Sequence, residues 1–204
     1  MIKTSLVTSA TGYPVELEDI KTHLRLDLGY TEEDDYLMTL RSAAVSKIES
    51  MTNRKLMSQT YKAYFDDWSD GNYMELPYSP LISIPATGVT YKNSTGNTTT
   101  FASSEWEADI RSTPGRIALS TTGGQDWPTA TLHETNPITI EFQCGYSTVA
   151  SGVPARLRQA VMMLISHWYE FREPYIVGGQ FNLSVARVPD AVNSLISDYR
   201  VFKF

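Results

Sequence analysis

The residues that could carry catalytic or metal chemistry are few, and they are scattered along the chain. The three histidines, His23, His133 and His167, lie far apart, and no H-E-x-x-H, C-x-x-C or two-histidine-one-carboxylate spacing occurs. Sequences of the form G-x-G-x-x-G, G-x-x-x-x-G-K-[ST] and G-x-S-x-G, the simplest signals for a phosphate cradle or a serine nucleophile, are also absent. We therefore expect no catalytic residue, no metal site and no cofactor.

Two features have a possible chemical role and a simpler structural one. The run from Asp66 to Asn72 resembles the start of a calcium loop, but Trp68 and Pro77 occupy positions that require oxygen ligands. Because Asp, Gly and Asn also form turns, we expect an acidic hairpin turn here.

Cys144 could pair with a histidine as a nucleophile, but it falls on the apolar face of a predicted strand, where a free cysteine usually belongs to the core.

Residues 167–173, His-Trp-Tyr-Glu-Phe-Arg-Glu, are the most unusual stretch of the chain. Trp168 and Phe171 continue an apolar helical stripe, which favours a place in the core over one in an interface. Tyr169 and Arg172 are left as candidates for an interface with a neighbouring subunit or another partner, because tyrosine and arginine are frequent in such surfaces.

Composition sets the broad class. The chain has 204 residues, of which 42% are hydrophobic and 20% charged, as in an ordinary globular protein, and its single cysteine excludes an internal disulfide framework. The formal net charge of −6 argues against a duplex-binding surface built on phosphate neutralisation. No basic start followed by an apolar run marks a signal peptide, and no apolar stretch approaches the roughly 18 residues of a membrane span, so we expect a protein of a reducing cytoplasm.

Apolar residues recur with helical spacing in the first quarter of the chain. The pattern predicts a helix over 17–28 and a second over 31–53, with Thr31 as its N-cap and Asn53 as a left-handed C-cap. The acidic run Glu32–Asp35 suits the positive end of the second helix, so we interpret it as a solvated helix start rather than as a metal cluster.

The period changes from helical to two near residue 58 and returns to helical near residue 153. Alternation is clearest over 59–65 and 138–144, and Gly-, Asn- and Pro-rich turns separate about half a dozen short segments. Prolines then open two further predicted helices, over 154–172 and 190–199.

These patterns predict an α+β fold: a small helical bundle of about four helices, interrupted by an inserted antiparallel β-sheet or sandwich lobe. We assign residues 1–57 and 150–204 to the helical domain and residues 58–149 to the β lobe. The loop 174–188 has no recognisable pattern, and its role is left open.

Short motifs follow one another in a recognisable order over nearly the whole chain. They are Val15 to Asp27, Asp34-Asp35-Tyr36-Leu37, Ala43-Ala44, Thr52-Asn53-Arg54, Gln59-Thr60, Leu76-Pro77, Pro80-Leu81, Pro114-Gly115-Arg116-Ile117, Trp127-Pro128, Gly145-Tyr146, Val153-Pro154, Gln159-Ala160, His167-Trp168-Tyr169-Glu170 and Arg172-Glu173. Their order resembles that of a known family, the head-tail connector (adaptor) proteins of long-tailed bacteriophages and gene transfer agents. Each motif alone is weak, and their order makes the resemblance specific. One of them, Thr52-Asn53-Arg54, departs from the usual Thr-Gly-Arg, which asparagine can absorb at a left-handed position.

The resemblance implies a structural protein rather than an enzyme. It implies a ring, dodecameric in the virion, that docks on the portal protein after DNA packaging and presents a platform to the neck or tail-completion (stopper) protein. DNA would pass through the ring without specific binding, and no membrane would be involved. The protein would sit at the head-tail junction of the virion and be assembled in the bacterial cytoplasm.

The C-terminal tail is the candidate for portal attachment. It follows an amphipathic helix, carries two aromatic residues with no predicted core to receive them, and has two basic residues in an acidic chain. The alternative is that its aromatic residues fold back onto the helical core. The expected portal-binding residues are Arg200, Val201, Phe202, Lys203 and Phe204, within an attachment that begins near Leu195.

A rival interpretation is a carbohydrate-binding module or hydrolase in which Trp68, Trp106 and Trp127 form a sugar-stacking platform. Trp106 weakens it, because this residue alternates with Ala108 and Ile110 on an apolar face.

Overall fold

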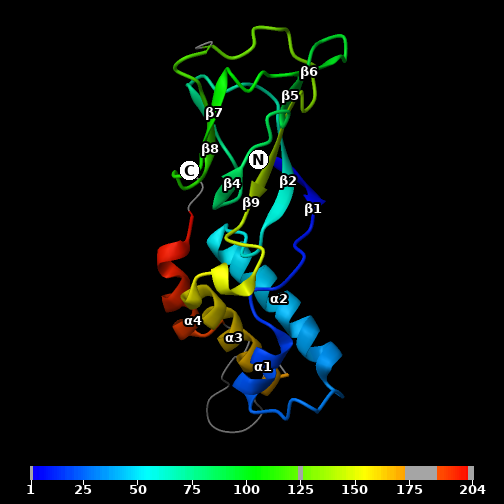
Figure 1. Ribbon diagram of the computed structural model, residues 1–204, viewed down its shortest axis with the longest axis vertical. Helices are drawn as coiled ribbons and strands as arrows, with labels where there is room; N and C mark the ends of the chain where they lie inside the picture. Colours follow the sequence, from blue (N-terminus) through cyan, green and yellow to red (C-terminus); the bar gives the residue numbers. More distant parts are fainter. Residues whose placement is uncertain (1, 124–125, 173–187, 202–204) are drawn as a thin grey trace, which may run out of the picture.

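The computed structural model describes residues 2–123, 126–172 and 188–201. The molecule is elongated, with the helices gathered at one end and the strands at the other (Figure 1). The expected α+β fold, a helical bundle interrupted by an antiparallel β lobe, is confirmed. Most of the loop 174–188 and the tail residues Phe202, Lys203 and Phe204 lie outside the described residues.

The helical part contains the four expected helices, and they share one apolar core. Helices α2 and α3 pack together along their length, and α1 and α4 lie against α3 (Figure 1). No described helix combines the length and the apolar character needed to cross a bilayer. The helices are α1 (Leu17–Leu24), α2 (Asp34–Thr52), α3 (Ala155–Glu170) and α4 (Asp190–Ile196), with 3-10 turns η1 (Ala150–Gly152) and η2 (Ser197–Tyr199). Fully buried core residues include Ile20, Leu37, Ala44, Ile48, Leu157, Leu164, Val192 and Ile196.

Helix α1 is shorter than predicted, because it ends at Leu24 rather than near residue 28. Arg25 takes the left-handed conformation with φ of 59°, and its N–H caps the helix. The buried Lys21 ammonium then donates hydrogen bonds to the carbonyl oxygens of Leu28 (3.3 Å) and Tyr30 (2.7 Å). The chain is thereby wrapped around a buried cation, an arrangement that apolar spacing does not indicate.

Helix α2 begins at Asp34, not at residue 31, and its acidic start is not simply solvated. Asp34 lies 2.7 Å from the Lys21 ammonium, and Glu33 lies 2.6 Å from the guanidinium of Arg172. The interpretation of the run as a solvated helix start was therefore wrong for Glu33 and Asp34, whose carboxylates tie the start of α2 to α1 and to the end of α3, whereas Glu32 and Asp35 are exposed. The predicted left-handed cap at Asn53 is confirmed, with φ of 54°.

The strands form two antiparallel sheets. The large sheet has the order β1-β2-β9-β5-β6, with β4 also pairing with β9, and the small sheet has the order β3-β8-β7. The strands are β1 (Lys3–Thr8), β2 (Gln59–Phe65), β3 (Tyr73–Glu75), β4 (Leu81–Ser83), β5 (Val89–Lys92), β6 (Thr98–Thr100), β7 (Trp106–Asp109), β8 (Arg116–Leu119) and β9 (Ile138–Cys144).

A second apolar core lies between the two sheets. Every second residue of β9, from Ile138 to Cys144, is buried, as the alternation predicted. Met74, Trp106 and Ile117 of the small sheet belong to the same cluster.

Strand β1 was not expected, since the sequence assigned residues 1–57 to the helical domain. It pairs antiparallel with β2, from Lys3 opposite Tyr64 to Leu6 opposite Tyr61, and it forms one edge of the large sheet. Most of its side chains are exposed, so its residues show no buried alternation that would have revealed it.

Candidate functional site

The end of the described chain is fixed against the C-terminus of α2. The N–H of Val201 donates to the carbonyl of Thr52 (3.0 Å), and Nδ2 of Asn53 donates to the carbonyl of Val201 (2.7 Å). Nε of Arg54 donates to the carbonyl of Tyr199 (2.7 Å). The last carbonyl groups of a helix have no hydrogen-bond partner within it, and the N–H of Val201 supplies a partner for the carbonyl of Thr52. We call this contact the tail anchor.

The five residues expected to bind a portal fall into three groups. Arg200 is exposed, and its guanidinium donates to Oδ1 of Asn193 (3.0 Å). Val201 is only 8% exposed and its backbone is hydrogen-bonded to Thr52 and Asn53, so in this chain it serves the tail anchor. Phe202, Lys203 and Phe204 follow directly after the tail anchor and lie outside the described residues.

Tyr169 and Arg172 lie together at the end of α3 and bind the residue that precedes α2. Nη2 of Arg172 donates to one oxygen of Glu33 (2.6 Å), and the hydroxyl of Tyr169 donates to the other. The guanidinium also lies over the ring of Tyr36, 4.8 Å from its centroid. The hydrogen bond from Tyr169, followed by that from Arg172, lowers the pKa of Glu33, and the same bond raises the pKa of Tyr169. The Arg172 side chain is still 55% exposed and within reach of a partner.

The two candidate sites stand at opposite ends of α2. Glu33 precedes the helix and Asn53 follows it, and its 19 residues span about 28 Å at 1.5 Å per residue. The structure therefore does not bring Tyr169 and Arg172 together with the tail, and the two sites can serve different partners.

The three tryptophans of the rival interpretation do not form a shared exposed platform. Trp106 is buried, and its Nε1 donates to the carbonyl of Phe101 (3.2 Å). Trp68 and Trp127 stack on each other with ring centroids 5.0 Å apart and an angle of 8° between the planes. Each of these two rings thus already covers one face of the other, and the sugar-binding alternative is not supported.

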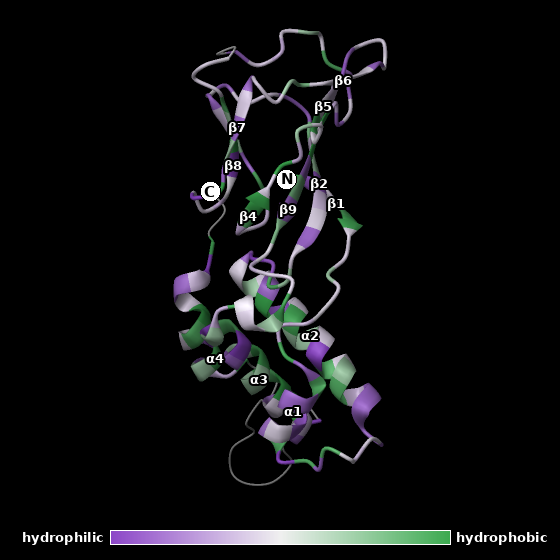
Figure 2. Cartoon of the chain, in the orientation of Figure 1, coloured by the Kyte–Doolittle hydropathy of each residue, from purple (hydrophilic) through white to green (hydrophobic). Residues whose placement is uncertain are grey.

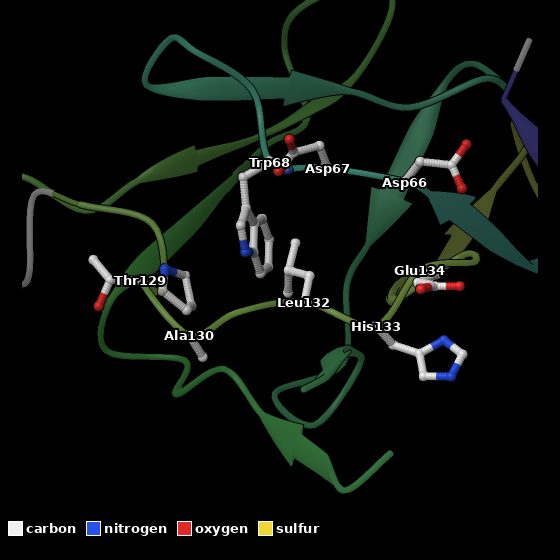
Figure 3. A pocket seen from close by; sticks show the side chains of 9 residues that line it. Asp66, Asp67, Trp68, Thr129, Ala130, Leu132, His133 and Glu134 are labelled. Carbon is white, nitrogen blue, oxygen red and sulfur yellow. Dashed lines mark hydrogen bonds between the residues drawn. The ribbon is translucent and has the colours of Figure 1, made fainter. Parts of the chain in front are cut away.

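A hollow of about 410 Å³ lies beside Trp68 in the β lobe, and Figure 3 shows Trp68 and Leu132 at its centre. Two of the carboxylates that line it accept hydrogen bonds from backbone N–H groups. Oδ1 of Asp66 accepts the N–H of Asn136 (3.1 Å), and Oδ1 of Asp67 accepts that of Trp68 (2.8 Å). Within the described ranges, no three His, Cys, Asp or Glu side chains are grouped to hold a metal ion. The hollow is lined by Asp66, Asp67, Trp68, Pro128, Thr129, Ala130, Leu132, His133 and Glu134.

Cys144 is fully buried at the end of β9, in the core between the sheets. Burial raises the pKa of its thiol to about 12. A neutral, inaccessible thiol is a core residue and not a nucleophile.

The tail anchor and the helical bundle suit a structural role, and comparison with known proteins points to the same function. The family model described as "Phage gp6-like head-tail connector protein" matches residues 14–114. Over these residues, just under half of its length, the chain is similar to this head-tail connector family. The match begins before α1, runs through α2 and continues into the β lobe as far as the turn before β8.

Solved structures have the same fold over almost the whole connector. A chain from the neck of an empty gene transfer agent (GTA) particle has a TM-score of 0.74 and 24% identity, covering 99% of this chain and 97% of that one. A chain from the virion of a native GTA particle has a TM-score of 0.76 and 24% identity, covering 98% and 96% respectively. No curated protein matches the chain at a significant level. The connector is a structural protein that joins head and tail, and its relatives are structural proteins of virions, which argues against an enzyme.

Sequence reasoning missed the residues that hold the tail. Thr52, Asn53 and Arg54 were singled out as a family motif, and Asn53 also as a helix C-cap, but none of them as a partner of the tail. Each of them makes a hydrogen bond of the tail anchor. The signal was present in the motif, but its partner lies 148 residues away along the chain.

Proposed function

We propose that the connector forms a ring at the head-tail junction of a virion and attaches to the portal protein through its C-terminal tail. The observation that carries this proposal is the tail anchor. The N–H of Val201 is bonded to the carbonyl of Thr52 and its carbonyl to the side-chain amide of Asn53, so the tail leaves the end of α2 from a fixed point. Phe202 and Phe204 would each bury an aromatic ring in the portal, and Arg200 and Lys203 would add cationic contacts.

A ring multiplies a weak contact. One short tail could supply only a few kcal/mol by burying its aromatic side chains, but copies arranged around a ring bind together with much higher avidity. Related necks were solved with C6 and C12 symmetry, which supports a cyclic assembly, and we propose twelve subunits for this connector.

The remaining surfaces would serve the rest of the junction. We propose that the face of the ring away from the portal receives the neck or stopper protein, and that Tyr169 and Arg172 contribute to an interface with a neighbouring subunit or partner. The net charge of −6 suits a channel through which DNA slides without specific binding, because like charges disfavour phosphate contacts. Assembly would take place in the host cytoplasm.

A pair of truncations tests the tail. Ending the chain after Val201 removes only the last three residues and keeps the tail anchor, so we expect an unchanged melting temperature and loss of binding to the cognate portal ring in negative-stain images and pull-downs. Ending the chain after Tyr199 also removes the two hydrogen bonds that Val201 makes in the tail anchor, so we expect both the melting temperature and portal binding to fall.

The two variants separate docking from folding. Full portal binding by the chain that ends at Val201 would contradict attachment through the tail. A large drop in its melting temperature would show instead that Phe202 and Phe204 fold back onto the helical core.

A further inference from the structure

Two opposite flanks of the β lobe expose apolar side chains. On one flank, Ile2 and the β1 residues Leu6 and Val7 are 40%, 51% and 46% exposed, and Figure 2 shows the hydrophobic end of β1 at the margin of the lobe. On the other flank, Tyr73 of β3 and Ile110, directly after β7, are 44% and 52% exposed. We call these surfaces the β1 flank and the β7 flank; they lie on opposite sides of the lobe in Figure 1.

The β1 flank is an incompletely covered part of the large sheet. Leu6 lies directly opposite Tyr61 of β2, and cross-strand partners point to the same face of a sheet. Tyr61 is buried in the core on that face, whereas Leu6 is 51% exposed and does not belong to that core. β1 is also an edge strand, so its outer N–H and C=O groups have no neighbouring strand among the described residues. Natural sheets usually protect such an edge.

Each flank carries one charged side chain that has no ion pair within the described part of the chain, Lys3 on the β1 flank and Glu107 on the β7 flank. Nζ of Lys3 on β1 donates to the uncharged amide oxygen of Asn136 (3.1 Å), and it has no ion pair there. Glu107 on β7 is exposed, accepts only a long hydrogen bond from the hydroxyl of Ser120 (3.4 Å), and likewise has no described cationic partner. Asp109 on the same strand differs, because Arg116 lies 2.9 Å from it.

A closed ring requires each subunit to present two different surfaces that fit each other. Given the ring of the proposed function, on which this inference rests, we propose that the β1 flank of one connector subunit docks on the β7 flank of the next. Lys3 pairs with Glu107 of the neighbouring copy, and Leu6 and Val7 cover its Ile110. The occupant of each flank is therefore a second copy of this chain.

Cross-linking of the wild-type chain tests the contact directly. Isotope-labelled and unlabelled connector are mixed, assembled on the cognate portal ring and treated with a carbodiimide, which joins an amine to a carboxylate without a spacer. We expect a mixed-isotope peptide in which Lys3 of one copy is joined to Glu107 of another. Lys3→Arg keeps the charge and should abolish this product, because a guanidinium does not react.

Charge reversal gives a second measurement. Lys3→Glu or Glu107→Lys should each raise the connector concentration needed for ring formation by about tenfold or more, and the double reversal should restore it. Lys47→Glu, an equal change at an exposed α2 residue, should leave ring formation unchanged. Circular dichroism checks that every variant is folded.

The outcomes distinguish this contact from the proposed function. Wild-type rings that give no Lys3–Glu107 product between copies, or a double reversal that does not restore ring formation, would overturn the contact and leave the ring and portal attachment intact. Failure of the wild-type chain to form rings with the portal would overturn both.

Discussion

Glu49 connects the helical part to the β lobe, and its removal should have a large effect on stability. It lies in the last turn of α2 and is only 9% exposed. One carboxylate oxygen lies 2.8 Å from Nζ of Lys55, and the other accepts the N–H of Leu56 (2.9 Å). Lys55 in turn lies over the ring of Tyr78, 4.9 Å from its centroid.

Glu49→Ala leaves the partly buried ammonium of Lys55 and the buried N–H of Leu56 without their acceptor. Breaking a buried ion pair by removing one partner costs about 3 to 5 kcal/mol. The Lys55 side chain is 17% exposed and keeps its contacts with aromatic rings, so part of this cost is recovered. We expect the free energy of unfolding to fall by about 2 to 4 kcal/mol, of which the N–H of Leu56 accounts for about 1 kcal/mol or more.

Urea unfolding followed by circular dichroism measures this effect, and the chain offers two matched controls. Glu49→Gln keeps an acceptor for the N–H of Leu56 and loses only the charge, so it should cost less than Glu49→Ala. Glu170→Ala removes an exposed glutamate from the last turn of another helix, α3, and should cost less than about 0.5 kcal/mol. If Glu49→Ala and Glu170→Ala destabilise the chain equally, the reasoning about the buried acceptor is wrong.

Three further predictions concern the helix end, the core thiol and the two apolar cores. Because the pKa of Glu33 is lowered, its contacts contribute stability above the ordinary glutamate pKa, and this contribution is lost as the pH falls through the lowered value. Arg172→Ala should therefore raise the NMR titration midpoint of Glu33, and an unchanged midpoint would contradict the pairing. Since burial raises the pKa of Cys144 to about 12, a thiol reagent should modify it only after unfolding, and rapid labelling of the folded chain would oppose this assignment. Replacing residues 60–145 with a short Gly-Ser linker, together with removal of residues 1–8, should leave a soluble helical protein, whereas complete loss of helical circular dichroism would show that the β lobe shares a core with the helices.

The elements that repeat a pattern over many residues could be predicted from the sequence. The four helices follow from apolar stripes, and β2 and β9 follow from alternation that the structure reproduces as alternating burial. Periodicity reports which side of an element faces a core, so it works where one side is fully buried. Strand β1 escaped because its side chains are mostly exposed, and the end of α1 escaped because Lys21 binds carbonyl groups beyond it.

The tail anchor and the contacts of Glu33 could not have been predicted in this way. They depend on single polar side chains that meet residues far away in the sequence, 148 positions apart for Asn53 and Val201 and 136 for Glu33 and Tyr169. No local spacing encodes such a pair: the helical pattern predicted Asn53 only as a left-handed C-cap, and only the resemblance to a family drew attention to Arg54.

The last turn of α2 and the two residues after it contact both the tail and the chain that leads into the β lobe. Within residues 49–54, Glu49 holds the chain that leads to β2, and Thr52, Asn53 and Arg54 hold residues 199–201. Arg54 also pairs with Ser79, next to the start of β4, through a β-bridge. If the tail attaches to a portal, a force on that attachment reaches the β lobe through one helical turn and a few hydrogen bonds. In the proposed ring this turn would have to be rigid to keep the β lobe aligned with the channel, and an ion pair of Glu49, a left-handed cap at Asn53 and the tail anchor all involve residues 49–54.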